Sequence, residues 1–545
     1  MRAADLFVRC LEQEGVKTIY GVPGEENVDL MDALLDSDIH FITTHHEQGA
    51  AFMAAMEGRL TGKPGVCLST LGPGATNLLT GVAAANMESS PLVAITGQGS
   101  EDRLHKESHQ IYDLEALFKP VTKWSDSIRK PEIIPEVIRK AFQMSMSEKP
   151  GATYIILPED IAAAEVTESP LESSPVPQLK TDELAMEHVA ETIERSERPI
   201  ILAGFGIARQ HAEDQLRDFA HRLQAPVVHT LMGKGAISSD DPLSFFTVGI
   251  QENDHITYGI DHADLVISIG YDMVEYPPAR WNPEGKIPVV HIDTEPAEID
   301  SCYPVTAAMH GRIDMNLAGL TTIIGNRSKL DPYYAKRRIE IVEAMDRYKG
   351  DSSFPIKPQR LIAELRDALY DKDILISDVG MHKMWLGRMY PTYHTNTCII
   401  ANAFASMGGA LPGAIAAARL NPHRNVLAVV GDGAFQMSLQ EMETAVRLEL
   451  PIVIVIWNDC RYGLIESKQM KEFGRASHVK FNNPDYVKLA EAYGAEGIRI
   501  TSAKDLKPTL EHALNRKKPI IIDCPIDFSV SMPLEEILGE VVSPS

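Results

Sequence analysis

Short, nearly continuous hydrophobic runs alternate along the chain with longer segments of helical periodicity. A run without polar alternation is typical of a parallel strand that is covered on both faces. Because helical segments separate the runs, the pattern predicts crossover units and doubly wound parallel sheets of the α/β class. The predicted strands include residues 65–69, 92–96, 154–157, 200–203, 265–269, 289–292, 374–377, 426–430, 452–457 and 520–523.

Two stretches rich in Pro, Ser and acidic residues are typical of linkers between domains. They lie at residues 165–182 and 349–358. They divide the chain into three α/β blocks, each of the usual size of one domain. The predicted blocks are residues 1–165, 183–348 and 356–545.

The composition excludes some classes of partner. The chain has 545 residues, with 52 Lys and Arg against 76 Asp and Glu, which gives a formal net charge of −24 at pH 7. A chain this acidic repels phosphates at long range, so neither a nucleic acid nor an anionic membrane is an expected partner. No apolar stretch approaches the roughly 18 residues of a membrane span, and no secretory pattern follows the first residues. The six cysteines include no Cys-x-x-Cys pair, so we expect six buried thiols and a cytoplasmic location.

The most informative motif follows the predicted strand at 426–430. That strand ends in Gly431-Asp432-Gly433, and the next strand ends in an acidic residue, Asp459, 27 positions after Asp432. Ligands bind beyond the carboxyl ends of parallel strands, so both carboxylates should face one point. The glycines let the backbone approach a phosphate, and two carboxylates facing a diphosphate require a hard cation such as Mg²⁺. Without the second acidic strand end, Gly-Asp-Gly would indicate only a tight turn.

A second candidate lies in the first block. Glu47 follows His46 and begins a helix that is otherwise small and apolar, directly after a strand-like segment at 39–44. We therefore expect this carboxylate to be buried. Taken alone, it could serve only to compensate the dipole of the helix.

Together these motifs resemble the signature of the thiamine-diphosphate enzymes, which combine Gly-Asp-Gly, a following Asn or Asn-Asp, and a His-Glu pair in the first domain. The resemblance covers essentially the whole chain and is closest to the catabolic, FAD-independent acetolactate synthases. It implies a pyrimidine-binding first domain, a central domain and a diphosphate-binding third domain. The closer likeness rests on residues 109–110, 120–123, 265–271, 274–276, 279–282 and 441–448.

This resemblance also implies the residues of a thiamine diphosphate and Mg²⁺ site. Glu47 would be catalytic, hydrogen-bonding the pyrimidine N1′, and a buried carboxylate suits such proton sharing. Asp432, Asp459 and the backbone carbonyl of Arg461 would bind Mg²⁺. Most of the superfamily has Asn at the position of Asp459. Asp at this position is a departure from the superfamily pattern, and the catabolic acetolactate synthases share it. The remaining cofactor-binding residues that it implies are Gly72, Pro73, Asn77, Gly380, Met381, His382, Met407, Gly431, Gly433, Ala434, Phe435, Tyr462, Gly463 and Leu464.

The implied reaction is the decarboxylation of pyruvate and the transfer of the resulting hydroxyethyl unit to a second pyruvate, which gives 2-acetolactate. Gln110 and His109 would line the pocket for the 2-oxo acids, although both are also ordinary polar residues. Lys468 stands where the biosynthetic enzymes carry Trp and the best-known catabolic ones carry Gln. It could bind the acceptor carboxylate as a point charge, or it could face solvent. The FAD-binding signatures of the biosynthetic branch are not evident, so FAD is not expected.

Two alternatives remain. One is a thiamine-diphosphate-dependent 2-oxo acid decarboxylase that releases an aldehyde, and the other is a thiamine-binding subunit without catalysis. Decarboxylases favour a His-His pair in a loop, whereas His45-His46 adjoins the glutamate itself, and the intact acidic residues argue against a silent subunit. In this superfamily the two domains that share a cofactor come from different subunits. The resemblance therefore implies a homodimer or homotetramer with shared active sites.

Overall fold

The structure is a computed structural model, and it describes residues 1–173, 182–250 and 255–529. Within these residues the chain forms three six-stranded sheets in which every strand pair is parallel. The predicted α/β class with three doubly wound sheets is thus confirmed. Residues 174–181 of the first predicted linker lie outside the described residues, whereas the second linker lies between two helices and contains neither helix nor strand before Pro358.

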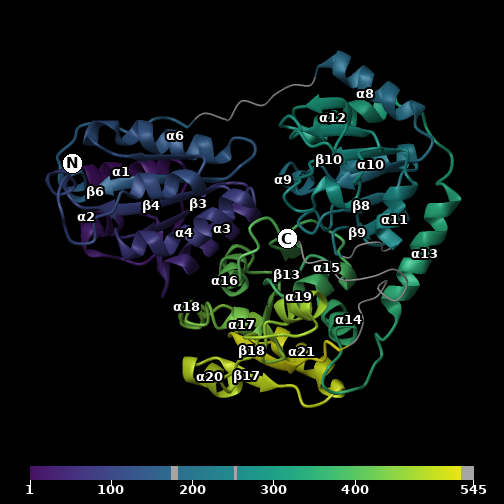
Figure 1. Ribbon diagram of the computed structural model, residues 1–545. Helices are drawn as coiled ribbons and strands as arrows, with labels where there is room; N and C mark the ends of the chain where they lie inside the picture. The colour runs from purple at the N-terminus through teal and green to yellow at the C-terminus, as the bar shows by residue number, and fades with distance from the viewer. Residues whose placement is uncertain (174–181, 251–254, 530–545) are drawn as a thin grey trace. The chain divides into compact units, whose positions relative to one another are not determined.

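The first sheet has the strand order β2-β1-β3-β4-β6-β5. Its strands are β1 (Thr18–Gly21), β2 (His40–Thr43), β3 (Gly65–Ser69), β4 (Leu92–Gln98), β5 (Trp124–Ser127) and β6 (Ala152–Pro158). Its helices are α1 (Ala3–Gln13), α2 (Val28–Leu34), α3 (Glu47–Thr61), α4 (Pro73–Met87), α5 (Leu114–Phe118), α6 (Ile134–Met146) and α7 (Glu159–Ala163). The helices α1, α2, α6 and α7 share a hydrophobic core on one face, and α3 and α4 pack together on the other (Figure 1).

The second sheet has the order β12-β11-β10-β7-β8-β9. Its strands are β7 (Pro199–Ala203), β8 (Val227–His229), β9 (Ser244–Thr247), β10 (Leu265–Ile269), β11 (Val289–Asp293) and β12 (Val305–His310). Its helices are α8 (Glu183–Arg195), α9 (Gly206–Arg209), α10 (Glu213–Leu223), α11 (His255–His262), α12 (Ile313–Ile323) and α13 (Pro332–Asp346). One core lies beneath α8, α9, α10 and α12, and a second core lies beneath α11 and α13 on the other face.

The third sheet has the order β14-β13-β15-β16-β18-β17. Its strands are β13 (Ile374–Ser377), β14 (Cys398–Ile400), β15 (Val426–Gly431), β16 (Ile452–Asn458), β17 (Glu496–Arg499) and β18 (Ile520–Pro525). The helices are α14 (Pro358–Ala368), α15 (Met381–Met389), α16 (Ala410–Leu420), α17 (Asp432–Phe435), α18 (Glu441–Arg447), α19 (Gly463–Phe473), α20 (Tyr486–Tyr493) and α21 (Leu506–Leu514). The helices α14, α15 and α21 share the core on one face of this sheet.

The chain forms two compact units. One contains the first sheet together with residues 403–422 and 436–450, so it includes α16 and α18. The other contains the second and third sheets. Two helices of the predicted third block thus belong to the same unit as the first sheet, and α16 packs against α3. The domain boundaries drawn from the sequence stay a prediction.

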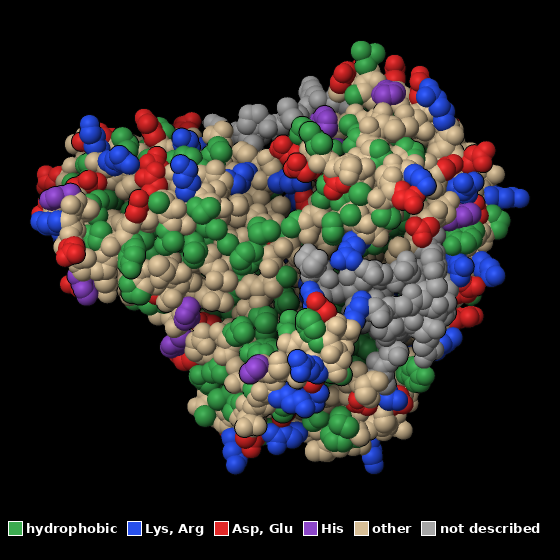
Figure 2. All heavy atoms as spheres, viewed as in Figure 1, with side chains coloured by type: hydrophobic (Ala, Val, Ile, Leu, Met, Phe, Trp, Pro, Cys, Tyr) green, Lys and Arg blue, Asp and Glu red, His purple; other side chains and the backbone are tan. Residues whose placement is uncertain are grey.

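The surface shows one departure from expectation. All six cysteines are free, but Cys460 is exposed and Cys302 is half-buried, so the prediction of six buried thiols is wrong for these two. Among the described residues, no helix combines the length and the apolar composition needed to cross a bilayer. Acidic and basic side chains are interspersed on the face that Figure 2 shows, with hydrophobic side chains between them.

Candidate functional site

The first group of candidate residues surrounds Glu47, in the unit built on the first sheet. Glu47 is the first residue of α3 and is 9% exposed. His46 caps this helix, because its imidazole Nδ1 accepts the backbone N–H of Gln48 at 3.1 Å. The side-chain amide of Asn77, on α4, donates to Oε2 of Glu47 at 2.9 Å. The fold therefore brings together two site residues that the sequence places on separate helices.

The other oxygen of Glu47 faces a glycine turn. A Cβ on Gly74 would lie 3.3 Å from Oε1 of Glu47, so the glycine leaves space beside that oxygen. Gly72 has φ +53°, in the left-handed region, and Pro73 begins α4 after it. A Cβ on Gly72 would lie 2.8 Å from the Cβ of Gln110, so this predicted pocket residue packs against the same turn.

The second group lies at the carboxyl ends of two adjacent parallel strands, β15 and β16, in the other unit. Asp432 is buried, and its Oδ2 accepts the backbone N–H groups of Asp459 at 3.2 Å and Cys460 at 2.6 Å. Its Oδ1 accepts the N–H of Gly433 at 2.8 Å. The two predicted metal ligands are therefore neighbours at one point of the sheet edge.

Both carboxyl groups hold protons more tightly than they do in water. Burial and then the charge of Asp432 raise the pKa of Asp459 to about 7. Burial likewise raises the pKa of Asp432, against the opposing effect of its hydrogen bonds. A divalent cation bound between them would remove this repulsion and favour the ionised forms.

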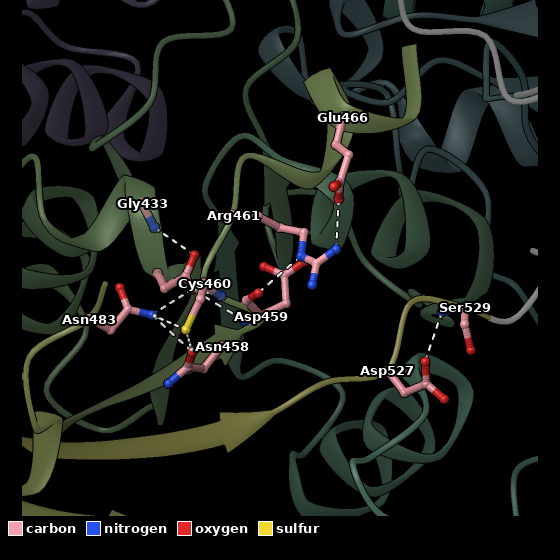
Figure 3. Close-up of polar contacts among 10 residues, drawn as sticks. Gly433, Asn458, Asp459, Cys460, Arg461, Glu466, Asn483, Asp527 and Ser529 are labelled. Carbon is pink, nitrogen blue, oxygen red and sulfur yellow. Dashed lines mark hydrogen bonds and ion pairs between the residues drawn. The ribbon is translucent and has the colours of Figure 1, made fainter. Parts of the chain in front are cut away.

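Arg461 lies next to this group and is held by contacts of both its side chain and its backbone. Its Nε donates to the backbone carbonyl of Asp459 at 3.1 Å, and its guanidinium pairs with Glu466 at 2.8 Å (Figure 3). The Arg461 backbone forms an antiparallel bridge with Lys480. These contacts fix the chain whose Arg461 carbonyl is the third predicted Mg²⁺ ligand.

His382 stands beside the Gly-Asp-Gly turn. It lies in the first turn of α15, after β13, and is 2% exposed. A Cβ on Gly380 would lie 2.8 Å from its Cε1, and a Cβ on Gly431 would lie 3.2 Å from it. Burial lowers the pKa of His382 to about 3, so its imidazole is neutral. Its buried Nε2 has no hydrogen-bond partner among the described residues, so a polar atom of a bound ligand could satisfy it there.

Three further predicted residues, Tyr462, Gly463 and Met381, contact this region. A Cβ on Gly433 would lie 2.6 Å from Cε1 of Tyr462. A Cβ on Gly463 would lie 3.2 Å from Oδ2 of Asp459 and 3.2 Å from Cγ of Met381. Predicted residues from β13–α15, β15–α17 and β16–α19 are thus in mutual contact.

The remaining predicted residues have other surroundings. Ala434 and Phe435 are buried in α17, and Leu464 packs against the core of the third sheet. Met407 is half-buried in the segment before α16, while His109 and Lys468 are exposed. Across the described parts of the chain, none of these last three side chains has a hydrogen bond to another predicted site residue. Their assigned roles stay predictions.

One residue that the sequence analysis did not single out lies at the centre of the acidic group. The amide of Asn483 donates to Oδ2 of Asp432 at 2.7 Å and to Oδ1 of Asn458 at 2.9 Å (Figure 3). Its only signal in the sequence is the Asn-Asn-Pro turn at 482–484, which indicates a loop and not a function.

The residues present fit both thiamine diphosphate and Mg²⁺. The buried His382 lacks a partner for Nε2, and glycines border it, so a diphosphate could approach the backbone there. Asp432 and Asp459 offer the one or two carboxylates that Mg²⁺ uses, with phosphate and water completing its shell. No group of three or more His, Cys, Asp or Glu side chains suited to a metal occurs in the described ranges.

Comparison with known proteins agrees with this geometry. The chain matches the thiamine pyrophosphate enzyme N-terminal TPP binding domain at residues 1–117, the central domain at 186–320 and the C-terminal TPP binding domain at 378–524. It is 35% identical to the acetolactate synthase of Bacillus subtilis over 98% of this chain and 94% of that protein. It is 36% identical to the catabolic acetolactate synthase of Raoultella terrigena over 96% and 95% of the two chains. It is also 35% identical to a probable acetolactate synthase large subunit of Methanocaldococcus jannaschii over 98% and 93%.

These similar identities do not separate the catabolic from the large-subunit relatives, but they extend over all three sheets. The chain belongs to the thiamine pyrophosphate enzyme family and, within it, is related to the acetolactate synthases.

Proposed function

We propose that this enzyme is a carboligase that converts two molecules of pyruvate to 2-acetolactate. One carbon–carbon bond breaks, between the carbonyl carbon and the carboxylate of the first pyruvate, and CO₂ leaves. One carbon–carbon bond forms, to the carbonyl carbon of the second pyruvate. The balanced reaction takes up one proton. When bound, thiamine diphosphate supplies the carbanion chemistry that these two bond changes require.

The observation that carries the proposal is the geometry of Glu47. Asn77 donates to Oε2, which fixes the carboxylate and leaves Oε1 beside the space at Gly74. Glu47 can therefore hold and release a proton at Oε1, the role that the pyrimidine ring of the cofactor requires of it. A positioned general acid–base of this kind typically contributes a factor of about 10²–10⁴ to the rate.

In the other unit, Asp432, Asp459 and the Arg461 carbonyl would hold Mg²⁺, and His382 would face the diphosphate. The positive charge of bound Mg²⁺ would offset the charges of the diphosphate and of the two carboxylates. Both carboxylates can therefore stay ionised near pH 7 when Mg²⁺ is bound. Gln110, packed on the Gly72 turn, would line the 2-oxo acid pocket. Lys468 is exposed on α19 and is free to contact an acceptor carboxylate.

We further propose that the enzyme works without FAD. The strand order of the second sheet places its switch point between β7 and β10, where such folds bind dinucleotides. There, the backbone N–H of Gly206 donates to the carbonyl of Gly270 at 2.9 Å. A largely buried ion pair at 3.2 Å joins Arg209 to Asp272 nearby. The proposal is supported by these contacts, in which the chain's own groups pair with one another near the switch point.

The active form that we propose is a homodimer or homotetramer, in which the cofactor is bound by Glu47 from one subunit and Asp432 from another. The support is the resemblance to the family, together with the division of these residues between two compact units. Sedimentation of the holoenzyme and complementation between inactive Glu47→Gln and Asp432→Ala chains would test it. Recovery of activity on mixing is the expected result, and an active monomer would contradict it.

The reaction is tested with pyruvate, thiamine diphosphate and Mg²⁺, without FAD, scoring 2-acetolactate (as acetoin after acid treatment) against acetaldehyde. We expect acetolactate, and we expect Glu47→Gln to lower its rate of formation at least about 100-fold. Acetaldehyde as the sole product would instead identify a 2-oxo acid decarboxylase. If pyruvate gives neither product, a panel of 2-oxo acids and aldehydes would show whether Lys468 selects another acceptor.

A further inference from the structure

The three residues that join β2 to α3 determine where Glu47 stands. β2 ends at Thr43, and α3 begins at Glu47. Within this corner the Thr44 hydroxyl donates to the His46 carbonyl at 3.2 Å, whereas the backbone N–H groups of His45 and His46 have their acceptor outside the corner. Both of these N–H groups are held by one side chain from far along the sequence.

That side chain is Glu441, the first residue of α18, which is fully buried. Its Oε1 accepts the N–H of His46 at 3.0 Å and the N–H of His45 at 3.1 Å. Its Oε2 accepts the hydroxyl of Thr444 at 2.8 Å. A Cβ on Gly49 would lie 2.7 Å from Oε1, so the glycine in the first turn of α3 makes room for this carboxylate.

A neighbouring pair makes a useful contrast. Glu443, on the same helix, contacts the imidazole of His45 at 2.7 Å and the guanidinium of Arg447 at 3.1 Å. Its side chain is 39% exposed, and that of His45 is 46% exposed. Exposed ion pairs contribute little, whereas charge-assisted hydrogen bonds to buried backbone N–H groups are strong. The restraint on the His45 and His46 N–H groups therefore comes from Glu441, while Arg447 donates to the carbonyl of Thr43 at the end of β2.

We propose that Glu441 is a positioning residue that fixes the His45–His46 backbone and so holds the Glu47 carboxylate in its proton-sharing position. This inference rests on the proposed function only in assigning Glu47 to proton exchange with the cofactor. Glu441 is nine residues after Asp432 in the chain. The segment that leaves the Gly-Asp-Gly motif therefore also sets the geometry of the catalytic glutamate.

The first test needs no cofactor. Amide hydrogen exchange by mass spectrometry would follow the peptide that contains residues 44–50 in Glu441→Ala, Glu441→Gln and the control Glu443→Gln. We expect exchange at His45 and His46 to be at least ten times faster in Glu441→Ala. An intermediate increase is expected in Glu441→Gln, whose amide oxygen can still accept one or both N–H groups. The control should match the wild type, and equal protection in all four proteins would overturn the proposal.

The second test measures the exchange of the C2 proton of bound thiamine diphosphate with D₂O, at saturating cofactor and Mg²⁺ and without pyruvate. We expect Glu441→Ala to slow it at least 30-fold and Glu441→Gln three- to tenfold, with cofactor affinity within threefold of the wild type. In a Glu47→Gln background the same changes should add less than threefold, because Glu441 acts through Glu47.

Several outcomes would contradict this. Equal losses in both backgrounds, or an unchanged exchange rate with weakened cofactor binding, would make Glu441 a purely structural residue. If Glu441→Ala does not fold, Glu441→Gln alone decides, and a rate within twofold of the wild type overturns the proposal. Because C2 exchange precedes any substrate, absence of acetolactate from pyruvate would refute the proposed reaction and leave this test intact.

Discussion

The side-chain amide of Asn483 donates a 2.7 Å hydrogen bond to Oδ2 of Asp432, the aspartate of the Gly-Asp-Gly turn, from 51 residues further along the chain. The same amide donates to Asn458 and so joins the ends of β15 and β16. Mutation of a residue that orients a metal ligand in this way typically weakens metal binding by about 10- to 100-fold. We predict that Asn483→Ala weakens Mg²⁺ binding by about 10- to 100-fold, measured by Mg²⁺ titration at saturating thiamine diphosphate.

The control for this change is Asn515→Ala, which removes an exposed asparagine whose amide donates to the backbone carbonyl of Glu511. Its Mg²⁺ affinity should equal that of the wild type. If Asn483→Ala binds Mg²⁺ as well as the control does, the hydrogen bond to Asp432 has no role in holding the metal.

The two aspartates should respond differently to the same substitution. The carboxylate of Asp432 accepts N–H groups from Gly433, Asp459, Cys460 and Asn483. An asparagine there would replace one accepting oxygen with an NH₂ group, which cannot accept these N–H groups. We predict that Asp432→Asn lowers the affinity for Mg²⁺ by at least about 10-fold. In Asp459→Asn the loss should be smaller, because removing one charge also removes the repulsion from Asp432 that, after burial, raises the pKa of Asp459. Equal losses in the two variants would contradict this ordering.

The sequence was sufficient to predict the features that local pattern controls. Continuous hydrophobic runs identified most of the internal strands of the three sheets, and the end of a run identified Asp432 and Asp459. Among the strands that the runs did not show, β5 (Trp124–Ser127) is a polar, half-buried edge strand with a weak periodic signal. β1 (Thr18–Gly21) and β8 (Val227–His229) are buried and internal, but they are too short to give a clear run. The partners of the site residues could not be predicted, because Asn483 and Glu441 reach them from distant segments through single side-chain contacts.

Resemblance supplied what the patterns could not. It assigned both Glu47 and Asn77 to the cofactor site, and the fold places them in hydrogen-bond contact. It gave roles to Met407, His109 and Lys468 as well, and these have no contact on the described chain that tests them. A residue that acts only when substrate or a second subunit is present leaves no trace in the packing of one chain.

Gly58, on the helix that carries Glu47, makes a close backbone contact that opposes the usual preference for Ala within a helix. Gly58 lies within α3, where Ala is normally favoured by about 1 kcal/mol. A Cβ at Gly58 would, however, lie 2.0 Å from the carbonyl oxygen of Pro91. Because backbone cannot yield as a side chain can, we predict that Gly58→Ala destabilises the protein by about 1–3 kcal/mol, measured by urea unfolding. Gly350→Ala, whose Cβ would meet no atom within 4 Å, should leave the free energy of unfolding nearly unchanged. A stabilised Gly58→Ala would show that propensity outweighs the contact.

The same helix carries a titrating group. Glu57 accepts the phenol of buried Tyr20 at 2.7 Å, and Arg419 donates to that phenol at 3.4 Å. Burial raises the pKa of Glu57 above its ordinary value of 4.5, although Tyr20 and Arg419 oppose the shift. The folded protein therefore binds this proton more tightly than the unfolded chain does. The stability that Glu57 contributes is fully present below about pH 4.5 and is lost as the pH rises through the folded pKa.

Glu57→Gln removes this titration and keeps a side chain of the same size that can still accept from Tyr20. We predict that the difference in Tm, wild type minus variant, is largest at the acidic end of a series between about pH 4 and pH 8 and decreases as the pH rises. Thermal unfolding of the two proteins in matched buffers measures it. A difference that stays constant or grows with pH would mean that Glu57 is not held with a raised pKa, and that its contacts with Tyr20 and Arg419 outweigh its burial.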